Sequence, residues 1–401
     1  MSTSLLYHAF KLPKVCYQRT EYQAGRIILH GFLRRKHHRC PICHGSNFEF
    51  YGPKTRLIRL VPIGLTPCFL SLTLHRIHCF QCGSIRWPHL PFIWRQTNLS
   101  KAFVRFTAEL CRLMTIQWVA ELLRVGWDCV KFIHKQFLAK KFQTIPLRDV
   151  RYVGIDEFAI RKGHRYMTIA LDLETGQILY ARQGKSAETI TPFLLDLRCR
   201  AHNLKAICID MSKGFIFAVQ DVLPHVAMVF DRFHIVRLFN EAMDEFRRRY
   251  HQEVEASRRL SLKASRFLLL ANPQNLSPPK QVKLQLLLEL NQPLNEFYLF
   301  KLQFMELWNL PDRKAAEDFL KVWAEQAWKV GNAVLHRLTK TIMMYSRFIL
   351  NWFEHPISTA KVEGTNNKIK TLKRTAYGYR DEEYFILRLL GLHLTTYSLS
   401  G

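Results

Sequence analysis

Two aspartates lie in segments where a solvated carboxylate is not expected. Asp156 and Asp210 each end an apolar stretch of strand-like composition, YVGID and AICID. A lone charge in such a setting is costly to bury, and two adjacent carboxylates raise each other's pKa. Both costs fall when the pair binds divalent cations, and hard oxygen ligands of this kind suit Mg²⁺ or Mn²⁺. We expect Glu157, the next residue along the strand, to point to the opposite face.

A third carboxylate is needed if two cations about 4 Å apart are to be held, and a late helical segment supplies one. Its spacing predicts an apolar stripe of Val362, Thr365, Ile369 and Leu372. The polar stripe beside it contains Glu363, Asn366, Asn367, Lys370 and Arg374. Such a face would offer a carboxylate, amides and cations to metal ions and to DNA phosphates. Spacing alone does not distinguish Glu363 from a solvated acid.

Two cysteine pairs near the amino terminus predict a second kind of metal site. Cys40 and Cys43 form one C-x-x-C motif, and Cys79 and Cys82 form another after a gap of 35 residues. Two such pairs complete the tetrahedral set of one structural Zn²⁺, and Gly83 follows the second pair as a zinc knuckle requires. Two alternatives remain open: unrelated pairs of buried thiols, or replacement of one cysteine by a nearby histidine, either His44, His75 or His78.

Helical elements after residue 98 predict a DNA-binding fold. Ser100 is placed to cap a first helix, and residues 116–123 and 127–137 predict two more, joined by a turn in which Gly126 is expected to take a positive φ. A short helix, a turn and a longer helix are the layout of a helix-turn-helix domain. The first helix is expected to bury Phe103, Phe106, Leu110 and Leu113. On the third helix, Lys131, His134 and Lys135 lie off the apolar stripe and are expected to contact DNA. An ordinary three-helix packing unit is the alternative.

The metal-binding aspartates fall within an alternating α/β pattern. Strands are predicted at 152–158, 165–172, 177–182, 205–209 and 226–230, with helices at 187–200 and 213–222 and a further helix after the last strand. This β-β-β-α-β-α-β-α order predicts an RNase H-like core, in which the first and fourth strands are neighbours and run parallel. Asp156 and Asp210 would then lie side by side.

The charge balance points to a polyanionic partner. The chain has 59 Lys and Arg against 32 Asp and Glu, a formal net charge of +27, and such a surplus is self-repelling unless a polyanion is bound. Nucleic acid is the best explanation, although a solvated basic surface is the alternative. No apolar run reaches the roughly 18 residues of a membrane span, and the first residues do not form a secretion signal. We therefore expect no membrane partner and a cytoplasmic location.

The motifs together resemble those of DDE transposases of bacterial insertion sequences, of the ISL-three type. The resemblance extends over essentially the whole chain and rests on the cysteine pairs, the helix-turn-helix and the segments GIDEFAIRKGHRY, AICIDMSKGF, VFDRFHIV and TAKVEGTNNKIKTLKR. It implies that Asp156, Asp210 and Glu363 are the catalytic acids and hold two Mg²⁺ or Mn²⁺. It also implies that Asp231 and His234, in a D-x-x-H signature, support the site. For His234, packing beneath the sheet is the alternative.

The resulting hypothesis is a multidomain α/β DNA transposase. Five regions are expected: 1–97, a zinc-ribbon-like module; 98–147, the helix-turn-helix domain; 148–236, the first part of the RNase H-like core; 237–356, an all-helical insertion; and 357–401, the last part of the core. The family implies binding to the terminal inverted repeats of the element and to target DNA, phosphodiester hydrolysis and 3′-hydroxyl strand transfer. It further implies a homodimer or higher homo-oligomer on DNA, associated with a bacterial nucleoid.

The residues expected to contact DNA lie on the two helical segments already named. They are Lys131, His134, Lys135, Asn366, Asn367, Lys370, Lys373 and Arg374. Two other functions remain possible: a catalytically silent DNA-binding regulator derived from a transposase, or an RNase H-like nuclease or resolvase that cuts without joining.

Overall fold

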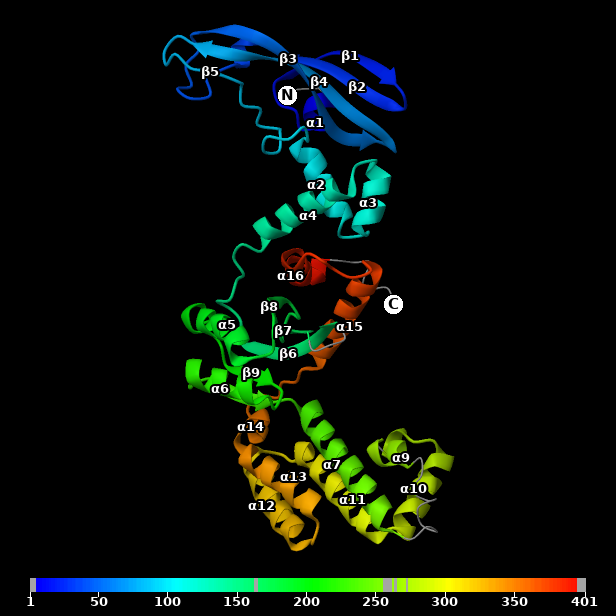
Figure 1. Ribbon diagram of the computed structural model, residues 1–401. Helices are drawn as coiled ribbons and strands as arrows, with labels where there is room; N and C mark the ends of the chain where they lie inside the picture. Colours follow the sequence, from blue (N-terminus) through cyan, green and yellow to red (C-terminus); the bar gives the residue numbers. More distant parts are fainter. Residues whose placement is uncertain (1–4, 162–164, 255–261, 263–264, 272, 395–401) are drawn as a thin grey trace. The chain divides into compact units, whose positions relative to one another are not determined.

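The computed structural model describes residues 5–161, 165–254, 262, 265–271 and 273–394 (Figure 1). The chain forms two compact units. The first consists of Met1–Thr144 together with Thr371–Gly401, and the second of Ile145–Lys370. None of the described helices is both long enough and apolar enough to cross a lipid bilayer.

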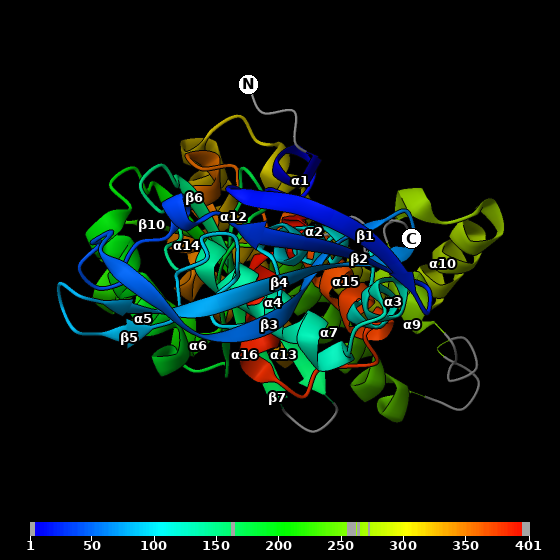
Figure 2. The same ribbon diagram turned by 90° about the horizontal axis from the view of Figure 1, so that it is seen from above.

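The first unit begins with a short helix, α1 (Leu5–His8), followed by a sheet built on two long hairpins. Its strands, in the order β1-β2-β4-β3 with β5 on β4, are antiparallel except for the β2–β4 pair, and Figure 2 shows the hairpins side by side. The first hairpin turns at Ala24 and Gly25, both of which have positive φ, as tight β-hairpin turns often require. The strands are β1 (Val15–Gln23), β2 (Arg26–Leu33), β3 (Phe48–Ile63), β4 (Thr66–Cys79) and β5 (Ile85–Arg86), with a 3₁₀ turn, η1 (Arg35–His37), after β2.

Three helices follow the sheet: α2 (Lys101–Leu110), α3 (Ile116–Leu123) and α4 (Trp127–Lys141). The predicted cap is confirmed, since the Ser100 hydroxyl accepts a hydrogen bond from the Phe103 amide at 3.1 Å. Two details were wrong. Leu113 is exposed because α2 ends at Leu110, and the positive φ between α3 and α4 belongs to Arg124 (+50°), while Gly126 caps α4 with φ −62°.

A buried arginine joins this helical part to the sheet. Arg59 of β3 donates to the Leu123 carbonyl at 2.6 Å, and its guanidinium lies 4.8 and 5.3 Å from the ring centroids of Phe69 and Phe103. Because the last turn of a helix leaves carbonyls unpaired, a buried cation can satisfy one of them. The sheet and the helices therefore pack against each other, although the sequence predicted a domain boundary between them at residue 97.

The carboxyl-terminal helix α16 (Glu382–Leu390) packs on α4 within the same unit, and η5 (Leu392–Leu394) follows it. His134 is only 3% exposed, and its Nδ1 lies 2.8 Å from the hydroxyl of Tyr384. The expectation that His134 faces DNA was therefore wrong, because a helix distant in sequence covers that side of α4. The segment 371–401 accordingly belongs with the amino-terminal unit, and only 357–370 belongs to the second unit.

The second unit contains a five-stranded sheet in the order β10-β9-β6-β7-β8. Strands β6 and β9 are parallel neighbours, as predicted for the first and fourth strands, and β9 and β10 are also parallel. The β6–β7 and β7–β8 pairs are antiparallel. The elements are β6 (Tyr152–Arg161), β7 (Arg165–Asp172), β8 (Ile178–Gln183), α5 (Ala187–Arg200), β9 (Ala206–Ile209), α6 (Lys213–Val222), β10 (Ala227–Phe230) and α7 (Arg232–Glu253).

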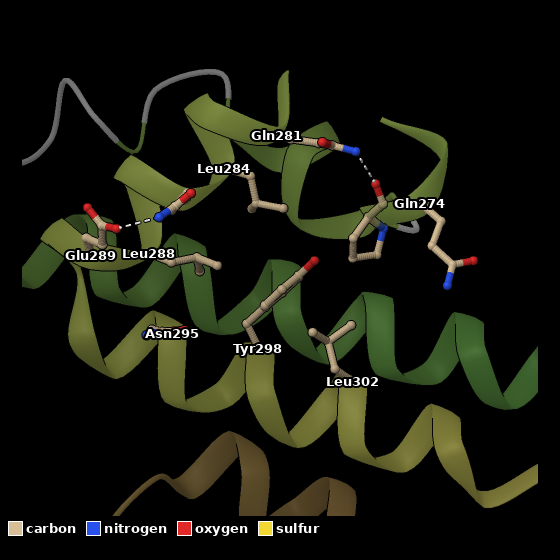
Figure 3. Close-up of a pocket in the computed structure, with 10 residues that line it drawn as sticks. Gln274, Gln281, Leu284, Leu288, Glu289, Asn295, Tyr298 and Leu302 are labelled. Atoms are coloured by element: carbon tan, nitrogen blue, oxygen red, sulfur yellow. Dashed lines mark hydrogen bonds between the residues drawn. The ribbon is translucent and has the colours of Figure 1, made fainter. Parts of the chain in front are cut away.

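Between α7 and residue 353 all described secondary structure is helical, as predicted for the insertion. Its core contains the rings of Phe239, Phe304 and Trp323, which meet in one tilted and two edge-to-face contacts. A cavity of about 570 Å³ lies between α10 and α11, with the Tyr298 ring in its wall (Figure 3). The helices are α9 (Arg266–Leu270), η2 (Pro273–Asn275), α10 (Pro278–Leu290), α11 (Gln292–Met305), η3 (Glu306–Asn309), α12 (Arg313–Lys329), α13 (Ala333–Met344), α14 (Ser346–Leu350) and η4 (Asn351–Phe353).

The chain then returns to the sheet through helix α15 (Ala360–Thr375). The predicted stripe of Val362, Thr365, Ile369 and Leu372 is buried. Glycine at position 154 of β6 permits a close approach of this helix. A Cβ added there would lie 2.6 Å from Leu173 Cδ2 and 3.0 Å from Val362 Cγ2. The helix that carries Glu363 thus begins against the strand that carries Asp156.

Candidate functional site

The strand register places Asp156 level with Asp210. In the parallel β6–β9 pair, Gly154 is aligned with Cys208, and each aspartate lies two residues further along its strand. Neighbouring strands are about 4.8 Å apart, and residues two positions apart share a face. The two carboxylates therefore belong to the same face of the sheet, at the carboxyl end of β9.

Asp156 is partly buried, and both of its carboxylate oxygens accept hydrogen bonds. Oδ1 accepts the Glu157 amide at 2.7 Å, and Oδ2 accepts Asn366 Nδ2 of α15 at 2.9 Å. Burial raises the pKa of Asp156, while the Glu157 amide and the charge of His234 oppose that increase and the charge of Asp210 adds to it. Asp210 is held by its own neighbour, since Oδ1 accepts the Ser212 amide at 3.0 Å.

Glu157 is a nearby acid that the sequence analysis set aside. Strand alternation separates its side chain from that of Asp156. Burial nevertheless raises the pKa of Glu157, and the charge of Asp210 raises it further. Its carboxylate is therefore within electrostatic range of the site. In the sequence, the only indication that Glu157 lies near the site is its position next to Asp156.

Glu363 lies in the first turn of α15 and is exposed. Its amide donates to the Thr359 carbonyl at 2.9 Å, so it is one turn beyond the start of the helix. Asn366, the residue bonded to Asp156, lies three positions later on the same side of the helix. Among the described residues, however, the three acids do not come within 4.8 Å of one another as a group. The strand register aligns Asp156 with Asp210, and Glu363 lies one turn from Asn366, the amide partner of Asp156.

Asp231 and His234 occupy the region that follows β10. Asp231 is 1% exposed, and its carboxylate accepts the Thr359 amide at 3.1 Å and the Thr359 hydroxyl at 2.6 Å. His234 lies close enough for its charge to lower the pKa of Asp156. Its Nδ1, like Asn366 Oδ1, is buried with no hydrogen-bond partner among the described residues.

These side chains fit a divalent cation. Carboxylate oxygens from Asp156 and Asp210 are hard ligands of the kind that Mg²⁺ and Mn²⁺ prefer. An unpaired buried polar atom is costly, and the Asn366 oxygen and His234 nitrogen, which have no partner among the described residues, are both close to Asp156. A cation would satisfy the Asn366 oxygen, and a water bound to that cation would pair with the His234 nitrogen.

The four predicted cysteines form a compact cluster in the first unit. Their sulfur atoms all lie within 4.8 Å of one another, with 3.6 Å between Cys40 and Cys82 and 3.5 Å between Cys43 and Cys79. A tetrahedron with Zn–S bonds of about 2.3 Å has sulfur–sulfur edges of about 3.8 Å. The arrangement therefore fits one zinc ion, and none of the histidines offered as alternatives joins the cluster.

The two cysteine turns have the same backbone design. The Cys40 amide donates to the Gly45 carbonyl and the Cys79 amide to the Ser84 carbonyl. The residue after each pair has positive φ: His44 at +59° and Gly83 at +66°. The Gly83 expectation is thus confirmed, and His44 takes the equivalent strained position. Amides of Cys43 and Ile42 lower the pKa of the Cys40 thiol to about 6, which favours the thiolate that metals bind.

The basic residues expected to contact DNA differ in availability. Lys131 and Lys135 both pair with Asp381, at 3.0 and 3.1 Å, and Lys135 also pairs with Glu383 at 2.7 Å. Of the three α4 residues expected to contact DNA, the two lysines are therefore in ion pairs and His134 is buried. On α15, by contrast, Lys370 and Arg374 are exposed, and Lys370 Nζ lies 3.3 Å from Asn367 Oδ1.

Comparisons with known proteins agree with one another. Residues 153–389 match the model of a family described as "Transposase", of the DDE, ISL3 type. The transposase for insertion sequence element IS1001 of Bordetella parapertussis is 33% identical over 354 residues, which is 87% of each chain. The transposase for insertion sequence element IS1557 of Mycobacterium tuberculosis is 25% identical over 375 residues, 87% of this chain and 84% of the relative.

Among solved structures, a chain of the Drosophila P element transposase strand transfer complex aligns with a TM-score of 0.42 and 10% sequence identity. The alignment covers 76% of this chain and 94% of that chain. At that TM-score it supports no inference about the fold.

Proposed function

The chain belongs to the ISL3-type DDE transposase family, and from that premise we propose that it cuts and joins DNA with divalent metal ions. In this proposal it binds the ends of its own insertion sequence, hydrolyses a phosphodiester bond and transfers the freed 3′-hydroxyl to target DNA. Asp156, Asp210 and Glu363 are the catalytic acids.

One observation carries the proposal. The register of β6 and β9 aligns the positions of Asp156 and Asp210 on neighbouring strands, and the Asn366 bond to Asp156 ties α15 to β6 one turn after Glu363. These two observations support the proposal that three acids from two strands and a late helix act together at one end of the sheet. The strand order β10-β9-β6-β7-β8, with its parallel β6–β9 pair, supports assigning this sheet to the RNase H-like class.

Hydrogen bonds orient two of the three proposed acids. Amides of Glu157 and Asn366 orient the Asp156 carboxylate, and the Ser212 amide orients Asp210. Asp156, Asp210 and Glu363 would hold two Mg²⁺ or Mn²⁺, which when bound supply activation of the attacking oxygen and charge neutralisation at the leaving oxygen. Ligands already fixed by their surroundings need little reorganisation during reaction, which is the main protein contribution to phosphoryl transfer.

DNA contacts are assigned to the remaining basic residues. Asn367, Lys370, Lys373 and Arg374 extend along α15 beyond Glu363 and would contact phosphates near the cut. Lys131 and Lys135 would contact DNA by exchanging their ion pairs with Asp381 for pairs with phosphate. Helices α2–α4, as a helix-turn-helix, and the sheet stabilised by one structural Zn²⁺ would recognise the terminal inverted repeats.

Two further expectations follow from the family. Two element ends must be cut in a coordinated manner, so the active species is a homodimer or a higher homo-oligomer on DNA. The reaction takes place where the element resides, on chromosomal DNA in a bacterial cytoplasm.

The test is cleavage and strand transfer on labelled DNA that carries the element ends, with Mg²⁺ or Mn²⁺. We expect Asp156→Asn to abolish both products. Asp196→Asn is the matched control, because Asp196 is an exposed acid whose partner is the surface residue Arg200. Tight end binding by the wild type without metal-dependent cleavage would instead identify a silent regulator. Cleavage without joining would identify a nuclease or resolvase, and equal cleavage by Asp156→Asn would contradict the assigned site.

A further inference from the structure

We propose that Asp231 is a positioning residue, which sets the place of Glu363 by holding Thr359 at the start of helix α15. The inference rests on the proposed function, since it assumes that Glu363 acts at the metal site.

Asp231 connects the strand of the second acid to the helix of the third. Its backbone amide donates to the Ile209 carbonyl at 3.1 Å, and Ile209 directly precedes Asp210. Its side chain accepts two hydrogen bonds from Thr359, which lies four residues before Glu363. A single residue therefore joins the two chain segments whose acids must act together.

The Thr359 contact is strong for its kind. Both carboxylate oxygens of Asp231 are used, and the hydroxyl bond is 2.6 Å long. Hydrogen bonds to an ionised acceptor are shorter and about twice as strong as neutral ones. Both partners are buried, with exposures of 1% for Asp231 and 6% for Thr359, so water does not compete for the bonds.

Helix geometry transmits this contact to Glu363. The Thr359 carbonyl accepts the Glu363 amide at 2.9 Å, which is an i to i+4 bond at the start of α15. A displacement of Thr359 would therefore move or fray the turn that carries Glu363. The other side of Glu363 is held by Asn366, three residues later, through its bond to Asp156. Glu363 lies between two anchors, and Asp231 supplies the first.

Burial argues against a direct role for Asp231 as a metal ligand. Both of its oxygens bond to Thr359 and its side chain is only 1% exposed, whereas Asp156, whose oxygens also accept two hydrogen bonds, is only partly buried. A metal ligand would instead be expected to leave an oxygen accessible to the site. The role that remains is to fix the backbone around Asp210 and Glu363.

Thr359→Val tests the inference, because it removes the hydroxyl and keeps the shape and the amide. Two quantities are measured. The first is the affinity of the purified full-length chain for Mn²⁺ without DNA, by titration calorimetry, and the second is Mn²⁺-dependent cleavage. Mutation of an outer-shell partner of a metal site lowers metal affinity or activity about 10- to 100-fold. We expect Thr359→Val to lower Mn²⁺ affinity and cleavage within that range. Thr359→Ser, which restores the hydroxyl, should recover most of it. Thr341→Val is the matched control, since that hydroxyl bonds only to a carbonyl of its own helix.

A double variant separates this inference from the proposed function. If Thr359 acts through Glu363, Thr359→Val should lower Mn²⁺ affinity in the wild type and have little further effect in a Glu363→Gln background. Loss of affinity in Glu363→Gln with wild-type affinity in Thr359→Val would overturn the positioning role alone. Wild-type affinity and cleavage in Glu363→Gln would overturn the assignment of Glu363 itself. Equal additional losses in both backgrounds would show that Thr359 acts elsewhere.

Discussion

Asp156 of β6 and Asn366 of α15 form a carboxylate–amide pair with a hydrogen bond of 2.9 Å between residues 210 positions apart. The pair ties the first strand of the sheet to a helix that enters after the whole helical insertion. Asn366 was expected to contact DNA, but its amide bonds to Asp156, the first of the proposed catalytic acids. Its neighbours Asn367 and Lys370 are still proposed to contact DNA.

Asn366→Ala should weaken catalysis and shift its pH dependence. The lost bond goes to a charged acceptor, and such bonds contribute about 1.5–3 kcal/mol, so cleavage near neutral pH should fall about 10-fold or more. The Asn366 amide lowers the pKa of Asp156 against the larger effect of burial. Its removal should raise that pKa, so the acidic limb of the rate profile should move to higher pH. A profile with an unchanged acidic limb would contradict this role, and Asn203→Ala, an exposed amide, is the control.

Gly154→Ala should displace α15 from the sheet. The added Cβ would lie 2.6 Å from Leu173 and 3.0 Å from Val362, and overpacking of this kind costs about 1–3 kcal/mol. We expect a lower melting temperature and a larger proportional loss of cleavage, because Val362 adjoins Glu363. In Gly331→Ala the new Cβ meets nothing within 4 Å, so that variant should behave as wild type. Full activity in Gly154→Ala would show that the helix tolerates the shift.

Cys82→Ser should remove zinc and destabilise the amino-terminal unit. Serine replaces a thiolate with a much poorer zinc ligand, and closed structural sites require all four ligands. Metal analysis should show about one zinc per chain in the wild type and far less in the variant, with weaker binding to element-end DNA. Cys199→Ser is the control, because that thiol is exposed and lies outside the cluster. Unchanged zinc content in Cys82→Ser would rule out the four-cysteine site.

The buried His134 should make stability depend on pH. Burial, with a smaller effect of Arg388, lowers its pKa from 6.5 to about 3. Between those values the unfolded chain binds a proton at this residue and the folded chain does not. Stability should therefore fall as the pH is lowered from about 6.5 towards 3, by up to about 1.4 kcal/mol per pH unit from this group.

Denaturant titrations at several pH values can isolate that contribution. The free energy of unfolding of His134→Asn should change less steeply below pH 6.5 than that of the wild type, since the carboxyl groups are common to both. His202→Asn, at an exposed histidine, should follow the wild-type slope. Parallel curves for His134→Asn and the wild type would contradict the assignment.

The strands and helices of the second unit were predictable because their signals are local. Strand β7 (Arg165–Asp172) and helices α5 (Ala187–Arg200) and α6 (Lys213–Val222) have the predicted bounds. Their apolar periodicity decides between strand and helix within a few residues. The parallel pairing of β6 and β9 followed from the order of these elements, because few topologies accommodate it.

Helix α4 shows where local reasoning fails. Periodicity placed His134 on the polar side of α4, yet Tyr384 and Arg388 of α16 enclose it. Lys131 and Lys135 were expected to be free for DNA, yet Asp381 binds both. Nothing within a few turns of α4 indicates that a helix about 250 residues later packs against it.

The sequence by itself determined the residue types that can do chemistry, the elements that carry them, and the four cysteines, Cys40, Cys43, Cys79 and Cys82, that form the cluster. Tertiary structure alone decided which groups meet: Asn366 with Asp156, Asp231 with Thr359, and His134 with Tyr384. The physical reason is that periodicity reports which side of an element is apolar, whereas a hydrogen-bond partner is chosen by packing between segments 128 to 250 residues apart.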